Sequence, residues 1–180
     1  MASGSSTANL PAFISAEPDG IASASTIDKS RTTTDAQMNN ADSLPGWSLH
    51  PQLEQDCITI ADLPLSRLLL SRDANYPWLL LVPRHPGASE VIDLGTVEQG
   101  QLMTEIDLVS RALKAVTNCD KLNIAAIGNV VPQLHIHVVA RRRDDPAWPK
   151  PVWGAAAARP YDLAARESFV AALRRKIGLL

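Results

Sequence analysis

The stretch "VVPQLHIHVVARRR", residues 130–143, alternates apolar and nitrogen-bearing side chains within a β-branched segment. Successive side chains of a β-strand point to opposite faces of the sheet. We therefore expect Gln133, His135 and His137 on one face of a strand and the apolar residues between them on the other. The apolar face can join a core. The polar face presents two of the four histidines of the chain beside an amide.

Five apolar runs predict the strands of an antiparallel sheet. They are short, rich in branched or aliphatic residues and separated by proline or turn residues. They cover residues 57–63, 66–72, 77–84, 121–129 and 133–141. Strands that are joined mainly by hairpins and by one long helix are typical of an α+β domain.

Two main helices are predicted. In residues 102–116 apolar side chains recur at spacings of four and three, which forms one apolar stripe, and Thr96 with Gln99 resembles a capping box before it. A second helix is expected over about 161–177, where basic residues in the last turn suit the negative end of the helix dipole. The folded domain is expected to cover residues 46–180.

Composition limits the partners and the cellular setting. Residues 1–45 are rich in Ser, Thr, Ala and Asn, and we expect them to be a disordered extension. The formal net charge of −2 does not indicate a nucleic-acid or membrane partner. No apolar run approaches the roughly 20 residues of a membrane helix. Cys57 and Cys119 form no C-x-x-C motif, which favours a reduced, cytoplasmic setting.

The residues alone leave three interpretations of the histidine pair open. His135 and His137 could be ordinary half-buried histidines, although desolvating several polar groups together is costly unless they are used. A catalytic zinc site would need a third protein ligand, and the chain holds only two other histidines. The third interpretation is nucleophilic attack on phosphorus, for which a neutral imidazole is competent, with Gly128 and Asn129 in the preceding loop close to the phosphate.

The segment "QLHIHVV" resembles the signature of the histidine triad (HIT) superfamily, in which three histidines alternate with apolar residues. The upstream "PWLLLVPRHP", the downstream "WPKPVWG" and the Gly-Asn pair before the histidines are also similar to the family, over about residues 47–176. The resemblance implies a hydrolase or transferase that acts on the α-phosphate of a nucleotide conjugate, such as a dinucleoside polyphosphate. It implies a nucleotidyl-histidine intermediate, a homodimer, and no required cofactor or metal.

The resemblance also assigns roles to individual residues. His135 takes the position of the nucleophile, and His137 that of the residue that contacts the phosphate and helps neutralise its charge. Gln133 replaces the first histidine and is expected to orient its neighbours through hydrogen bonds. Substrate contacts are expected from Asn129, Gly128, Asn123 and Asp73, the last of these at the ribose. The alternative is a nucleotide-binding protein of the same fold that does not catalyse a reaction.

Two further features have more than one interpretation. Trp148 and Trp153 could close over the site, pin the proline-rich segment around them, or fill a dimer interface. The run Arg141, Arg142 and Arg143 could attract an anionic substrate, but we expect at least two of the three to be a solvated strand end.

Overall fold

The structure is a computed structural model that describes residues 46–180; the expected disordered extension, residues 1–45, lies outside the described residues. The elements follow one another along the chain in an order close to the predicted one. They are α1 (Pro51–Asp56), β1 (Cys57–Asp62), β2 (Ser66–Ser71), β3 (Trp78–Pro83), the single turn η1 (Val91–Asp93), α2 (Thr96–Thr117), β4 (Lys121–Ala125), β5 (Ile136–Arg141) and α3 (Leu163–Lys176).

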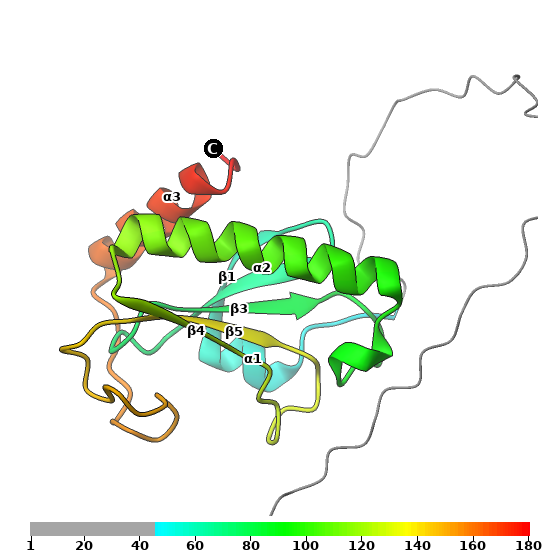
Figure 1. The fold of residues 1–180 in the computed structure, drawn as a ribbon, viewed down its shortest axis with the longest axis horizontal. Helices are drawn as coiled ribbons and strands as arrows, with labels where there is room; N and C mark the ends of the chain where they lie inside the picture. The colour runs from blue at the N-terminus through cyan, green and yellow to red at the C-terminus, as the bar shows by residue number, and fades with distance from the viewer. Residues whose placement is uncertain (1–45) are drawn as a thin grey trace, which may run out of the picture. The chain divides into compact units, whose positions relative to one another are not determined.

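The five strands form one antiparallel sheet in the order β1-β2-β3-β5-β4, which confirms the predicted α+β class with two long helices (Figure 1). Two strands are shorter than predicted. β4 ends at Ala125 and β5 begins at Ile136. The residues between them leave the ladder and form a loop that contains Gly128 and Pro132. Proline has no N–H to donate to a ladder, which disfavours strand structure at this point.

The helices α2 and α3 cover one face of the sheet (Figure 1). The main core lies between them, and alternate residues of the central strands point into it, such as Leu68 and Leu70 of β2 or Leu79 and Leu81 of β3. From β5 this core receives Val138 and its alternate neighbours. The apolar residues at every second position of these strands therefore fill this core, as the alternation in the sequence predicted.

The start of α2 differs from the prediction by one residue. Its N-cap is Gly95 rather than Thr96, and the Glu98 carboxylate accepts a hydrogen bond of 2.9 Å from the Gly95 N–H. Gln99 is not part of a capping box, because its amide donates to the Leu94 carbonyl oxygen at 2.8 Å. A carboxylate in the first helical turn also interacts favourably with the helix dipole, which supports this choice of cap.

The opposite face of the sheet is also covered. A second apolar cluster lies there, around Leu69 and Leu80 of the sheet and Trp47 and Leu53 of the N-terminal segment and α1. Every residue of β5 is buried, because Ala147 and Val152 pack against Val139 on this face and the rings of Trp78 and Trp153 pack against His137. His137 is only 5% exposed. None of the helices in residues 46–180 is long and apolar enough to cross a membrane.

Candidate functional site

A cavity of about 870 Å³ lies on the sheet face opposite α2 and is large enough for a small-molecule ligand. Its walls are α1, the turn between β2 and β3, the loop before β5, and the segment that leads to α3. Most of the residues predicted for the site line it: His135, His137, Gly128, Asn129 and Asp73. The structure therefore brings together residues that are up to 64 positions apart in the sequence.

The hydrogen bond of His135 defines its tautomer. Its Nδ1 lies 2.7 Å from the main-chain carbonyl oxygen of Gln133. Because a carbonyl oxygen can only accept, Nδ1 carries the proton and Nε2 keeps its lone pair. A neutral imidazole in a cavity, with Nε2 not engaged by this contact, has the form that a nucleophile requires.

His137 has the opposite tautomer. The indole N–H of Trp78 donates to its Nδ1 at 3.0 Å, and its Nε2 lies 3.2 Å from the carbonyl oxygen of Ile127. Nδ1 is therefore the acceptor and Nε2 the donor. Burial, and secondly repulsion from His135, lower the pKa of His137 to about 4. At neutral pH its side chain is an uncharged N–H donor.

Two tryptophans pack against this histidine. The ring centroids of Trp78 and Trp153 lie 5.4 Å and 5.2 Å from that of His137, both at steep angles, and His135 approaches it edge-on at 4.8 Å. Trp153 lines the cavity. Trp148 does not line it.

The loop before β5 approaches His135 closely at Gly128. A Cβ atom at this position would lie 2.9 Å from the Val131 carbonyl oxygen and 3.4 Å from Cε1 of His135. The first of these distances is too short for any other residue without a shift of the backbone. Glycine therefore allows the loop, with Asn129 beside it, to form the wall of the cavity next to His135.

Gln133 orients His135, but its side chain is not the group that does so. The main-chain carbonyl accepts the His135 bond, whereas the side-chain amide donates to the Ser48 carbonyl oxygen and accepts from the His50 N–H, both at 2.9 Å. The expectation that the amide itself would hydrogen-bond to the neighbouring histidines is therefore not what the structure shows. Gln133 lines a smaller hollow of about 230 Å³ on the other side of the loop rather than the main cavity.

Asn123 does not line the cavity, so the structure does not bring this predicted substrate contact to the site. It pairs across the sheet with Val139, two residues beyond His137, so its side chain lies further along the same face. There its Oδ1 accepts a 2.7 Å hydrogen bond from the buried guanidinium of Arg141. This arginine also binds both oxygens of Asp145, at 2.7 and 3.0 Å.

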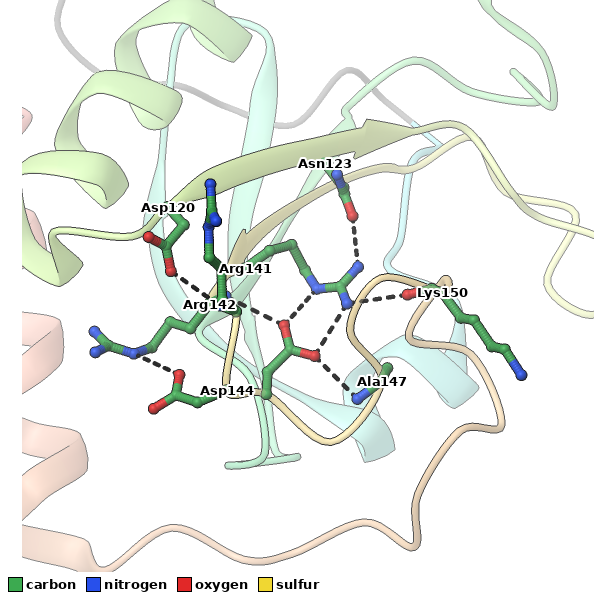
Figure 2. A network of polar contacts seen from close by, with 9 residues as sticks. Asp120, Asn123, Arg141, Arg142, Asp144, Ala147 and Lys150 are labelled. Carbon is green, nitrogen blue, oxygen red and sulfur yellow. Dashed lines mark hydrogen bonds and ion pairs between the residues drawn. The ribbon is translucent and has the colours of Figure 1, made fainter.

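The same guanidinium holds the proline-rich segment in place. It donates to the Lys150 carbonyl oxygen at 3.0 Å (Figure 2). It also lies 5.7 Å from the ring centroid of Trp148. Trp148 is thus part of the support for this segment, which ends at the cavity with Trp153. Arg142 and Arg143 are exposed, as predicted for two of the three arginines.

Asp73 lines the cavity and also anchors one of its walls. Its Oδ1 accepts from the Asn75 N–H at 2.9 Å and from the Arg159 N–H at 3.1 Å. The Ala74 N–H donates to the Arg159 carbonyl oxygen at 2.7 Å, and the Asn75 amide donates to Ala157 at 2.8 Å. The turn between β2 and β3 therefore pins the segment before α3 over the cavity.

Trp78 was not predicted from the sequence as a residue of this site, although it lines the cavity and binds His137. Its side chain lies on the same face as Leu80, which pairs directly with His137, so the tryptophan is a diagonal cross-strand neighbour of the histidine. Only the pairing of β3 with β5 would have shown this. Within residues 46–180 no group of three or more His, Cys, Asp or Glu side chains could hold a metal ion.

Comparisons with known proteins are consistent with this geometry. A family model described as the HIT domain matches residues 52–144. A histidine triad protein from Bradyrhizobium japonicum is 62% identical over 74% of this chain and 99% of its own, with a TM-score of 0.73. One from Sinorhizobium meliloti is 42% identical, over 72% and 96% of the two chains, with a TM-score of 0.71. One from Marinobacter aquaeolei is 37% identical, over 74% and 98%, also with a TM-score of 0.71. No match is found among curated proteins.

Proposed function

Because this chain belongs to the HIT domain family, we propose that it acts on the α-phosphate of a nucleotide conjugate, most simply a dinucleoside polyphosphate, through a nucleotidyl-histidine intermediate on His135. The observation that supports this proposal best is the hydrogen bond from His135 Nδ1 to a main-chain carbonyl. This bond leaves Nε2 as the nucleophilic atom of a neutral ring that lines a cavity of suitable size.

The reaction is proposed to have two steps. First, the Nε2 lone pair of His135 attacks the α-phosphorus, and the bond from phosphorus to the bridging atom breaks with its electron pair leaving on the departing group. The ring then carries a positive charge, which the short hydrogen bond from Nδ1 to Gln133 stabilises. In the second step water attacks the same phosphorus and loses a proton to solvent. His135 and a nucleoside monophosphate are released.

The other residues at the cavity are proposed to bind the substrate. The Nε2–H of His137 contacts Ile127 at the long distance of 3.2 Å, and a phosphate oxygen would be a stronger acceptor for it. Given the low pKa of His137, we propose that it donates a hydrogen bond rather than a full positive charge. Gly128 and Asn129 would meet phosphate oxygens and Asp73 the ribose. Asn123 receives no role at the substrate.

We also propose that the protein is a homodimer. β4 lies at one end of the sheet, where a strand presents main-chain groups that a second chain can pair with. Ile124 on this strand is 50% exposed, which is more than expected for an isoleucine without a partner. Light scattering coupled to size-exclusion chromatography measures the mass directly, and Ile124→Lys should shift a dimer toward the monomer.

The test of the mechanism is to trap the intermediate. The protein is incubated with a diadenosine polyphosphate labelled in adenosine, quenched, and searched by mass spectrometry for AMP on His135. An adduct that is present in the wild type and in His85→Ala, but absent in His135→Ala, supports the proposal. His85 is a partly exposed histidine that does not line the cavity, so it is a matched control. Binding without adduct or hydrolysis would instead favour a nucleotide-binding protein without catalysis.

A further inference from the structure

The carboxamide of Gln133 binds main-chain groups and not the histidines. Its Nε2 donates to the Ser48 carbonyl oxygen and its Oε1 accepts from the His50 N–H, each at 2.9 Å. These two main-chain groups are two residues apart and meet the same side-chain terminus. The side chain of Gln133 therefore binds main-chain groups of residues 48–50, which lie more than 80 positions away in the sequence.

The segment that Gln133 holds leads directly into one wall of the cavity. His50 is the N-cap of α1, where its Nδ1 accepts from the Gln52 N–H at 3.1 Å. α1 then contributes four consecutive or nearly consecutive residues to the cavity lining: Gln52, Leu53, Gln55 and Asp56. The orientation of α1 therefore depends at its start on the two hydrogen bonds to Gln133.

The far end of this wall is distant from the reacting histidines. α1 begins beside Gln133, but it continues into β1, which is separated from β5 by β2 and β3 in the sheet. At about 4.8 Å between neighbouring strands, β1 lies roughly 14 Å from β5. Substrate atoms beside Gln55 and Asp56, at the end of α1, are thus not the atoms at which bonds form or break. They belong to the portion of the substrate that is bound without reacting.

The chemistry of the side chain explains why glutamine suits this position. A carboxamide has a donor and an acceptor at one terminus, which is what a C=O and an N–H two residues apart require. A carboxylate of the same shape has no donor for the Ser48 oxygen. An imidazole has one nitrogen of each kind in its neutral form, but the two point in divergent directions. The substitution of the first histidine of the motif by Gln133 therefore adds a contact that histidine does not make equally well.

We propose that Gln133 is a positioning residue that holds the α1 wall of the cavity and thereby sets the affinity for the non-reacting part of the substrate, not the rate of the chemical step. For the identity of the substrate, this proposal rests on the proposed function. The hydrogen bonds between Gln133 and the start of α1 are independent of that function. An interaction that contributes equally to substrate and transition-state binding changes KM while kcat stays constant.

The experiment compares Gln133→Glu and Gln133→Leu with the control Gln99→Glu. The control removes an amide donor to a main-chain carbonyl, as Gln133→Glu does, but at the start of α2, where Gln99 does not line the cavity. Steady-state hydrolysis of diadenosine tetraphosphate gives kcat and KM. Amide hydrogen exchange measured by mass spectrometry reports on peptides from residues 48–56, with peptides from α2 as an internal reference.

Both Gln133 variants should raise KM by about tenfold, the effect of two partly exposed hydrogen bonds, and leave kcat within about twofold. Exchange in residues 48–56 should become faster in both variants but not in the control. A fall in kcat at constant KM would overturn the proposal, because it would place Gln133 in the chemistry. So would unchanged exchange in residues 48–56.

Failure of the proposed function gives a different result. If the wild-type protein hydrolyses no nucleotide conjugate, the kinetic comparison disappears for all four proteins alike. The exchange measurement still decides whether Gln133 holds α1, because it needs no substrate. The two proposals therefore fail through separate observations.

Discussion

The indole of Trp78 donates a hydrogen bond to Nδ1 of His137, 3.0 Å away, and so selects the tautomer in which His137 presents its Nε2–H. Tryptophan can act only as a donor, so it cannot support the other neutral form. The contact also places a wall of aromatic rings behind His137, since Trp78 and Trp153 meet it and each other edge-on. Four predictions follow from this contact and from the surrounding structure.

Trp78→Phe should release the tautomer of His137. Phenylalanine keeps most of the ring packing but removes the donor, so Nδ1 can itself carry the proton. Nitrogen-15 NMR of the histidine rings should change from one tautomer in the wild type to a mixture. We expect kcat to fall by about tenfold, the effect of weakening one hydrogen bond from His137 to the phosphate. Trp148→Phe is the control, because Trp148 contacts Arg141 instead. A single unchanged tautomer in Trp78→Phe would contradict the assignment.

The stability of the fold should fall at mildly acidic pH because of His137. Its pKa is about 4 in the folded protein, against about 6.5 for a histidine in an unfolded chain. The unfolded state therefore takes up a proton first as the pH decreases. Above pH 6.5 the free energy of unfolding is therefore larger by roughly 3 kcal/mol than it is once His137 is protonated in both states. This difference is lost progressively as the pH falls from 6.5 to about 4. The free energy of unfolding, measured in urea, should fall less steeply with acid in His137→Leu than in the wild type; equal slopes would refute this.

Gly128→Ala should displace the loop beside His135. The added methyl group meets the main-chain oxygen of Val131 at 2.9 Å, which side-chain rotation cannot relieve. We expect a loss of about 1–3 kcal/mol in the free energy of unfolding and a decrease in kcat. Gly100→Ala is a matched control. It lies in α2 with open space around it, so alanine should stabilise the helix by about 1 kcal/mol. Similar effects of the two changes would contradict the close approach.

Arg141→Met should be strongly destabilising, whereas Arg142→Met should be almost neutral. Arg141 and Asp145 form a buried pair, with side chains 2% and 6% exposed, so the change leaves a buried carboxylate without its cation. The expected cost is about 3–5 kcal/mol. Arg142 pairs with Asp144 at the surface, where such pairs contribute less than about 1 kcal/mol. Denaturant unfolding of both variants tests the difference, and a small effect of Arg141→Met would refute the role of this network.

The sequence predicted the sheet, the two long helices and the placement of His135, just before β5, on the same side as His137 of β5. These features depend on local periodicity, which a single sequence displays directly. The side chains that form hydrogen bonds with the candidate site residues could not be predicted in this way. Nothing near Asn123 in the sequence indicates that Arg141 would bind it, because the contact follows from the pairing of β4 with β5.

The same limitation applies to the walls of the cavity. Residues 48–56 and 153–160 lie far from the histidines in the sequence, and their positions depend on a few hydrogen bonds to Gln133 and to the turn at Asp73. The burial of β5 on both faces has a similar origin, because Ala147 and Val152 pack against Val139 while Trp78 and Trp153 pack against His137. Periodicity identifies which residues share a face. It does not identify what covers that face.

The acceptor for His135 Nδ1 is a peptide oxygen, which every amino acid at position 133 supplies. The tautomer of His135, the proposed nucleophile, is thus set by the path of the main chain and does not depend on the side chain two residues upstream. A mutation at this position can change what the protein recognises without dismantling what it does. For protein engineering, position 133 is the natural place to vary ligand preference while the reactive centre is left in its original form.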